Sequence, residues 1–363
     1  MTCCHEESSV GMAHGYAKIE GKPLCIFAHG TVGLQHAAMA IYNAYCDRVP
    51  VYIVIGNNLD ATKRDSAYGE WPHSVQDAAA MVRDYVKWDD VPISLQHFAE
   101  SAVRAYKIAM TPPMAPVLLV ADSELQENPI PEQANLHIPK LTLPGLPQGD
   151  SGSVMEAARL LVQAENPAIM VDHYARTQDG LERLIEFAET LQAPVIDLAG
   201  RLNFPTRHPL NQSSRRARLI GDADVIIGLE VTNFWGSLNT MRDQVHRTSR
   251  PIMKTGAKLI SITTGDLNIK ANYQDFLSGL LPIHRGRFGH GRGRRGNPAV
   301  ADRGDQAPDH CQSQAGVAGS RSQASQSTRT DPGPSANRRD LCVGREPDQY
   351  RPCVRRDLEP DQG

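Results

Sequence analysis

PLCIFAHGTVGLQHAAMAIYNAYCDRVPVYIVIGN, residues 23–57, is the stretch that decides the fold. Residues 23–30 have the apolar character of a strand and end at a glycine, and residues 33–48 have the pattern of an Ala-rich amphipathic helix. Residues 49–57 are a nearly continuous apolar run of strand length, as expected for a central strand of a parallel sheet, which is covered on both faces. This order predicts two parallel strands joined by a crossover helix.

The same alternation continues along the chain. Helices are predicted at 74–86 and 94–110, each beginning after a serine N-cap, and a strand at 115–122. Residues 124–150 are rich in proline and indicate a linker. A second series of helices and strands fills residues 151–270. The sequence therefore predicts an α/β protein with two doubly wound parallel-sheet domains.

Composition argues against several classes of function. The 363-residue chain has a formal net charge of -3, which does not favour binding to nucleic acid or to a membrane surface. Its apolar runs have the length of strands and are too short to span a bilayer. The seven cysteines have no regular spacing and do not suggest a disulfide framework, so a cytoplasmic location is expected.

The first residues, Cys3-Cys4-His5-Glu6-Glu7, contain several groups that bind metals in other proteins. A zinc-protease helix would place a second histidine four residues after the first, but Ser9 stands there. The two cysteines are adjacent and lack the spacing of a zinc site. No metal site is predicted here. Taken alone, the two glutamates are explained by a helix over residues 6–18, whose first turn favours carboxylates.

A longer pattern changes this interpretation. Residues 5–57 resemble the pyrimidine-binding domain of thiamine-diphosphate enzymes of the acetolactate-synthase and pyruvate-decarboxylase group. The matching segments, in the family's order, are His5-Glu6, the helix from Gly11 to Ala17, Gly21-Lys22-Pro23, the turn Gly30-Thr31-Val32-Gly33, and Ala44 to Val51. Residues 151–270 are similar to the Rossmann-like central domain of the same family. That domain has no G-x-G-x-x-G here, and no bound nucleotide is predicted in it.

The resemblance implies roles for individual residues. Glu6 corresponds to the family's glutamate that hydrogen-bonds a ring nitrogen of the aminopyrimidine and so activates the cofactor. His5 would be its neighbour at the end of a strand, and Cys3 and Cys4 would lie in that buried strand. Gly30 and Thr31 would form the turn beside the pyrimidine. His73, as a catalytic residue, and Gln76, as a cofactor-binding residue, would face the reacting centre, although His73 could equally be a residue that only precedes a capped helix. The implied reaction is cleavage or formation of a C–C bond in a 2-oxo acid, with thiamine diphosphate and Mg²⁺ as cofactors.

The sequence departs from the family in its second half. Relatives hold Mg²⁺ and the diphosphate through a C-terminal domain whose motif begins Gly-Asp-Gly and ends in asparagine, and this sequence contains no Gly-Asp-Gly. The opening of the pyrimidine-binding domain is also short compared with relatives. We therefore expect an incomplete pyrimidine-binding domain at 1–123, a linker at 124–150, a central domain at 151–276 and a tail at 277–363.

The tail has an unusual composition, with 14 arginines and no lysine over residues 277–363. It contains too few apolar residues to form a core, so we expect it to be disordered. A coding frame displaced by one base permits an amphipathic helix in place of residues 295–310, which indicates a frameshift near Leu277. An Arg-Gly-rich tail that binds RNA is the alternative.

Two classes of function remain open. One is a thiamine-diphosphate enzyme of the homo-oligomeric kind found in the family, inactive as an isolated chain because the diphosphate-binding domain is missing. The other is a non-catalytic, doubly wound nucleotide-binding or regulatory subunit that pairs with an intact homologue.

Overall fold

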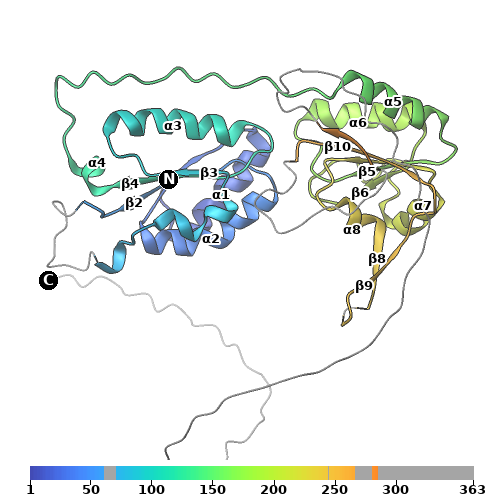
Figure 1. Cartoon of the computed structure of the whole chain (residues 1–363), viewed down its shortest axis with the longest axis horizontal. Coiled ribbons are helices and arrows are strands. Elements are labelled where there is room, and N and C mark those ends of the chain that lie inside the picture. Colours follow the sequence, from blue (N-terminus) through green and yellow to red (C-terminus); the bar gives the residue numbers. More distant parts are fainter. Residues whose placement is uncertain (61–70, 244, 266–279, 285–363) are drawn as a thin grey trace, which may run out of the picture. The chain divides into compact units, whose positions relative to one another are not determined.

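The computed structural model describes residues 1–60, 71–243, 245–265 and 280–284, and these lie in one compact unit, Met1–Gly293. Two parallel sheets organise the unit, and helices cover both faces of each (Figure 1). The doubly wound α/β architecture expected from the sequence is confirmed.

The first sheet has the strand order β1-β2-β4-β3, and all its pairings are parallel. The strands are β1 (Cys25–Ala28), β2 (Tyr52–Asn57), β3 (Trp88–Asp90) and β4 (Val117–Asp122). The central strands β2 and β4 are almost wholly buried, because helices cover both of their faces.

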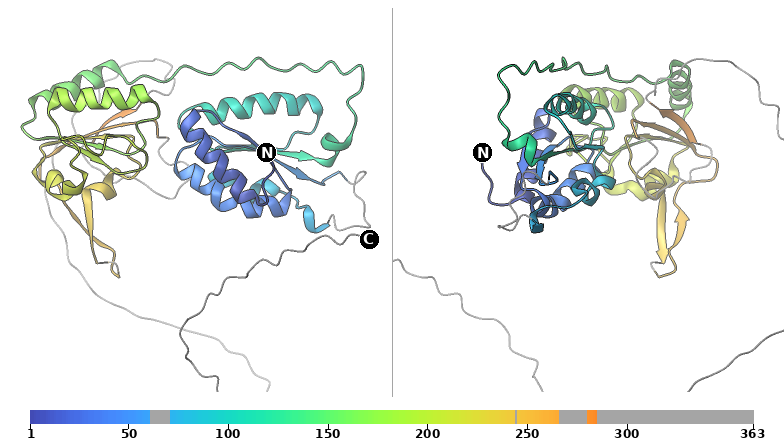
Figure 2. Two further views of the ribbon diagram at one scale, coloured as in Figure 1. Left: turned by 180° about the vertical axis from the view of Figure 1, so that it is seen from behind. Right: turned by 60° about the vertical axis from the view of Figure 1, so that its left-hand side comes forward.

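Helices α1 (Glu6–Glu20) and α2 (Thr31–Cys46) lie on one face of this sheet, and α3 (Leu95–Met110) lies on the other (Figures 1 and 2). The buried side of α2 repeats at helical spacing through Leu34, Ala37, Ile41 and Ala44. These side chains pack with the strands in a core that also includes Val10 and Ala13 of α1.

Three local expectations are wrong. Residues 74–86 do not form an α-helix after Ser74; they form the 3₁₀ turns η2 (Ala78–Met81) and η3 (Arg83–Tyr85), because the Asp77 side chain accepts from the Ala80 amide and starts a tighter turn. Cys3 and Cys4 are not in a buried strand, since they precede α1 and are half-buried and exposed. His5 is therefore not at a strand end. It is the N-cap of α1.

A short helix, α4 (Ser123–Glu127), leads from β4 into a proline-rich segment that has no regular structure before Gly149 and is mostly exposed. The second sheet follows, with the order β11-β10-β7-β5-β6. Its strands are all parallel: β5 (Pro167–Val171), β6 (Val195–Asp197), β7 (Val225–Leu229), β10 (Lys258–Thr263) and β11 (Leu280–His284).

The second sheet is also covered on both faces. Helices α5 (Ser151–Gln163) and α6 (Gln178–Leu191) bury Leu161 and Leu184 against one face. Helices α7 (Arg216–Asp222) and α8 (Phe234–Leu238) bury Ile220 and Phe234 against the other. A hairpin of β8 (Asn239–Asp243) and β9 (Thr248–Pro251) projects from this domain and was not expected from the sequence (Figure 1).

The predicted start of the disordered tail, at residue 277, is wrong. Leu280–His284 form strand β11 and pair with β10. The remaining residues of the expected tail lie outside the described part of the chain. Among the described helices, none is both long enough and apolar enough to cross a membrane.

Candidate functional site

The carboxylate of Glu6 is placed by the first turn of α1. His5 caps this helix, and its Nδ1 accepts a hydrogen bond from the Glu7 amide at 3.3 Å. Glu6 is half-buried and lies against Gly33 of α2. A Cβ atom built on Gly33 would be 2.9 Å from Glu6 Oε1 and 3.2 Å from its Cγ. The carboxyl group therefore occupies space that exists because residue 33 has no side chain.

The turn between β1 and α2 brings Gly30 and Thr31 next to His73. A Cβ on Gly30 would lie 2.8 Å from the Gly56 carbonyl oxygen and 3.3 Å from that of His73, so only glycine fits here. The Thr31 hydroxyl donates to the His73 carbonyl at 3.0 Å. The ring of His73 meets that of His29 edge-on, with centroids 5.0 Å apart.

The segment that carries His73 and Gln76 is held to the end of β2. The Asn57 side-chain amide donates to the Val75 carbonyl at 2.9 Å and accepts from the Val75 amide at 3.4 Å. Gln76 is exposed in the turn that follows and makes none of the contacts described above. Of the predicted site residues, the structure brings Gly30, Thr31 and His73 into direct contact, and it places Glu6 against Gly33 of the same glycine turn.

A carboxylate at this position is a group that could hold the aminopyrimidine of thiamine diphosphate. Glu6 offers a carboxylate beside a glycine turn, and this group takes the space that a side chain at residue 33 would fill. A separate cavity of about 270 Å³ opens on the side of α3 and α4, with Phe27, Phe98 and Leu125 in its largely apolar wall. None of the predicted site residues lines that cavity.

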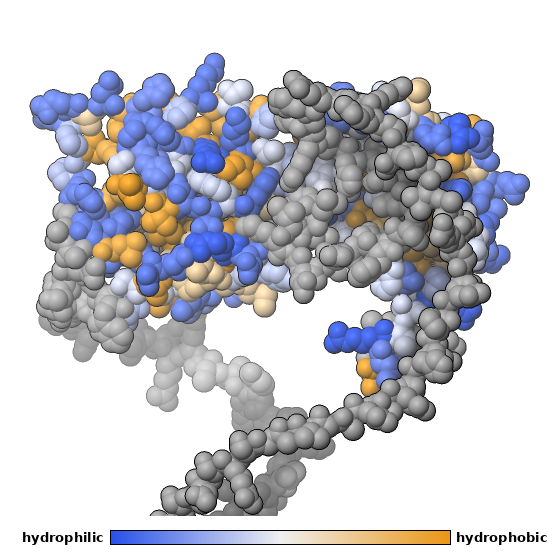
Figure 3. All heavy atoms as spheres, in the orientation of Figure 1, coloured by the Kyte–Doolittle hydropathy of each residue, from blue (hydrophilic) through white to orange (hydrophobic). Residues whose placement is uncertain are grey.

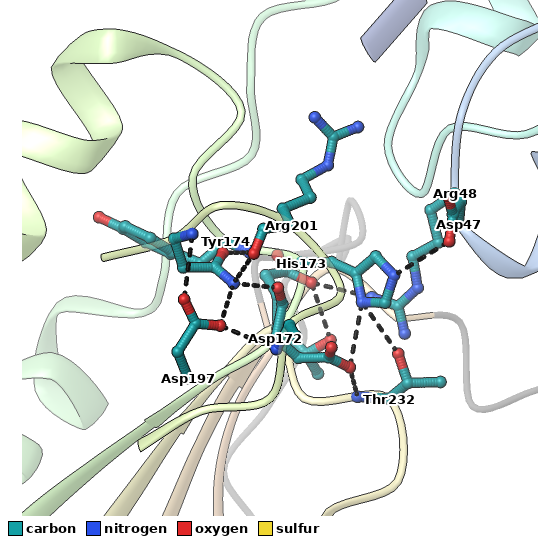
Figure 4. Close-up of polar contacts among 12 residues, drawn as sticks. Asp47, Arg48, Asp172, His173, Tyr174, Asp197, Arg201 and Thr232 are labelled. Carbon is teal, nitrogen blue, oxygen red and sulfur yellow. Dashed lines mark hydrogen bonds and ion pairs between the residues drawn. The ribbon is translucent and has the colours of Figure 1, made fainter. Parts of the chain in front are cut away.

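A second polar cluster lies at the carboxyl ends of the second sheet, and the sequence analysis missed it (Figure 4). Its centre is Glu230, which follows β7 and has a left-handed φ of 51°. The Glu230 carboxylate accepts from Arg48 Nη1 at 3.0 Å, from the Thr263 hydroxyl at 3.1 Å, and from the amide and hydroxyl of Thr264. Arg48 comes directly after α2, so this ion pair connects the two sheets' domains.

Asp172 and His173 extend the cluster from the end of β5. The carboxylate of Asp172 lies 3.0 Å from His173 Nδ1 and accepts from the Thr232 amide at 3.1 Å. Burial works to raise the pKa of Asp172, but these two partners outweigh it and hold the pKa below its ordinary value. Asn203, fully buried, accepts from the amides of residues 174 and 175 and fixes the loop after β5.

Asp47, beside Arg48, faces the same region from α2. It accepts from Lys18 Nζ at 2.9 Å and lies 2.9 Å from His14 Nε2. Burial opposes ionisation of Asp47, but Lys18 and His14 lower its pKa overall. Burial lowers the pKa of Arg201, and the negative charge of Asp47 partly offsets this. The signal for this cluster was present in the sequence as polar residues after successive apolar strands, but no motif marks it.

These features define the chain as an α/β protein of two doubly wound parallel-sheet domains, the first of which places a carboxylate against a glycine turn. Residues 1–81 match the family model of the thiamine pyrophosphate enzyme N-terminal TPP binding domain, and residues 154–278 match that of the thiamine pyrophosphate enzyme central domain. The chain belongs to the thiamine pyrophosphate enzyme family, as the resemblance indicated.

Individual relatives agree with this assignment. The chain is 27% identical over 228 residues to benzoylformate decarboxylase of Pseudomonas aeruginosa. This match covers 62% of this chain and 42% of that protein. It is 28% identical over 198 residues to the acetolactate synthase large subunit of Haemophilus influenzae. This match covers 53% of this chain and 33% of that protein. The chain thus spans less than half the length of these relatives.

The fold is also found among solved structures. The crystal structure of benzoylformate decarboxylase from Polynucleobacter necessarius superimposes with a TM-score of 0.61 at 24% identity, and the match covers 75% of this chain and 50% of that one. A putative thiamin diphosphate-dependent enzyme from Mycobacterium smegmatis gives a TM-score of 0.59 at 23% identity.

Proposed function

We propose that this chain forms the aminopyrimidine-binding side of a thiamine-diphosphate-dependent site that acts on 2-oxo acids, with Glu6 as the cofactor-activating residue. The observation that carries the proposal is the position of the Glu6 carboxyl group against Gly33, at the turn that begins with Gly30. Bound thiamine diphosphate would supply the carbon nucleophile needed to cleave or form a C–C bond beside a carbonyl.

The chain's own residues have distinct roles in this proposal. Glu6 hydrogen-bonds a ring nitrogen of the aminopyrimidine and holds a proton there. Gly30 and Thr31 border the ring, and the bond from Thr31 to the His73 carbonyl keeps the segment that follows close to it. His73 and Gln76 face the substrate, where the exposed imidazole is available to donate or accept a proton.

The isolated chain is proposed to be inactive and to bind thiamine diphosphate weakly. Relatives use a Gly-Asp-Gly motif for Mg²⁺ and the diphosphate, and this sequence contains none. We also propose homo-oligomeric assembly. The exposed apolar side chains of α1 and α2 support it, including Ile19 at 85% exposure and Met39 at 62%. Hydrophobic residues reach the surface in several patches between polar ones (Figure 3). The cytoplasmic location and the domain boundaries stay predictions.

Thiamine binding to the purified chain tests the role of Glu6. Saturation-transfer NMR with millimolar thiamine should give a signal for the aminopyrimidine protons. Glu6→Gln should abolish the signal, because the amide cannot hold the proton at the ring nitrogen. Glu7→Gln, the adjacent and exposed glutamate of the same helical turn, should keep it. Equal signals in both variants would refute the activator role.

Calorimetry tests the second part of the proposal. Titration of thiamine diphosphate into the chain with Mg²⁺ should show no saturation in the micromolar range. Micromolar binding that disappears on chelation of Mg²⁺ would show that the chain holds the diphosphate unaided, and this part of the proposal would be wrong.

A further inference from the structure

Two histidines from different helices meet beside Glu6. His5, the N-cap of α1, points its Nε2 at Nδ1 of His36 on α2, 2.9 Å away. The two ring centroids are 4.6 Å apart, at an interplanar angle of 31°. One ligand atom from each ring and one carboxylate oxygen of Glu6 all lie within 4.8 Å of one another. We call these three residues the His5–Glu6–His36 cluster.

Two imidazoles and one carboxylate are a ligand set that suits Zn²⁺ and related transition-metal ions. Zinc bonds to nitrogen of about 2.0–2.1 Å in a tetrahedral arrangement place ligand atoms roughly 3.3 Å apart. The two imidazole nitrogens, at 2.9 Å, need to separate only slightly to admit the ion. The carboxylate oxygen lies within 4.8 Å of these nitrogens and must move inward by rotation of the Glu6 side chain.

The cluster is accessible. Both histidines are exposed and Glu6 is half-buried, so an ion can enter from solvent and keep a water ligand in its fourth position. Three protein ligands with one open position are the arrangement of non-structural zinc sites. We propose that, in the chain without thiamine, the His5–Glu6–His36 cluster binds a divalent transition-metal ion of the Zn²⁺ type, and that the ion and the aminopyrimidine would compete at Glu6. The sequence did not predict this site, because His36 is 31 residues away from His5 and carries no motif.

Metal binding changes the proton arrangement at His5. Without a metal, Nδ1 of His5 accepts a hydrogen bond from the Glu7 amide. The ring proton of neutral His5 is therefore on Nε2, which donates it to Nδ1 of His36. When Nε2 binds a metal, the single ring proton of neutral His5 moves to Nδ1, and the Glu7 amide loses this acceptor. Metal binding therefore replaces the hydrogen bond between the two histidines, and it also removes the hydrogen bond by which His5 caps α1.

Cobalt titration tests the proposal, because Co²⁺ occupies zinc sites and absorbs visible light. The full chain, kept reduced with a phosphine, should bind one Co²⁺ with a visible d–d spectrum, and added Zn²⁺ should remove that spectrum. His36→Asn should weaken binding by more than about 100-fold, since loss of a residue that merely orients a ligand already costs about 10–100-fold. His5→Asn should do the same, and asparagine also caps helices, so α1 is retained.

His137→Asn is the matched control, because His137 is exposed and its hydrogen bonds to Gln96 are made by its backbone. It should bind Co²⁺ like the unaltered chain, and circular dichroism should show that all three variants are folded. Absence of stoichiometric binding would overturn the proposal, as would binding that survives His36→Asn. Strong sulfur-to-cobalt charge-transfer absorption would place the ion on the thiols near the N-terminus, such as Cys3, and would also overturn it.

Discussion

The ion pair between Arg48 and Glu230 should contribute strongly to stability. The Arg48 side chain is 14% exposed and that of Glu230 is 5% exposed, so removal of one partner leaves a buried charge without its counter-ion. Loss of one member of such a pair costs about 3–5 kcal/mol. Glu230→Gln also weakens the acceptor for Thr263 and Thr264, and Arg48→Met keeps most of the apolar side-chain volume. Each variant should lower the free energy of unfolding by about 3–5 kcal/mol.

The measurement is a double-mutant cycle by equilibrium urea unfolding of the full chain. The double variant should be much less destabilised than the sum of the two single variants, because neither charge is then left alone. Arg159→Met is the control, since its ion pair with Glu156 is exposed and its loss should not change the unfolding midpoint measurably. Additive effects, or single-variant losses below about 1 kcal/mol, would show that this contact does not hold the two domains together.

Two further predictions concern the glycine turn and the acid response. Gly33→Ala should abolish the thiamine NMR signal, because the new Cβ would lie 2.9 Å from Glu6 Oε1, and also 2.9 Å from His29 Cβ, and would displace the carboxylate. A retained signal would contradict the proposed position of the ring. Asp172 has a pKa below its ordinary 3.8, so the unfolded chain binds more protons at this residue than the folded one as the pH falls. The stability that Asp172 contributes is present above its unfolded pKa and is lost as pH falls through the lower folded value. Asp172→Asn should therefore show a smaller decrease of Tm between about pH 5 and pH 3 than the unaltered chain, and parallel pH curves would exclude this contribution.

The regular elements could be predicted where burial imposes a clear pattern. Strand β2 is apolar along its length because both faces are covered, and the buried residues of α2 recur at helical spacing. Strand β3 was missed because its three residues, Trp-Asp-Asp, have no apolar alternation, and its place in the sheet comes from pairing with β4. The 3₁₀ turns at residues 78–85 were missed because Ser74 and Asp77 are both acceptable caps, and only the fold selects between them.

In the candidate site, too, the sequence predicted residues of continuous motifs but not contacts between distant residues. Glu6, Gly30 and Thr31 could be predicted because they belong to motifs that are continuous in sequence. The contact of His5 with His36, and that of Arg48 with Glu230, join residues 31 and 182 positions apart. Nothing in either local sequence specifies such a partner, because the pairing depends on how the helices and the second sheet pack.

The two ends of helix α2 contact two different regions, the segment of His73 and the second sheet. Its first residue, Thr31, holds the His73 segment, and the residues just past its last turn, Asp47 and Arg48, face the second sheet. A helix of 16 residues is about 24 Å long and resists bending over that length. A single straight element therefore carries the contact with Glu230 at one end and the glycine turn at the other.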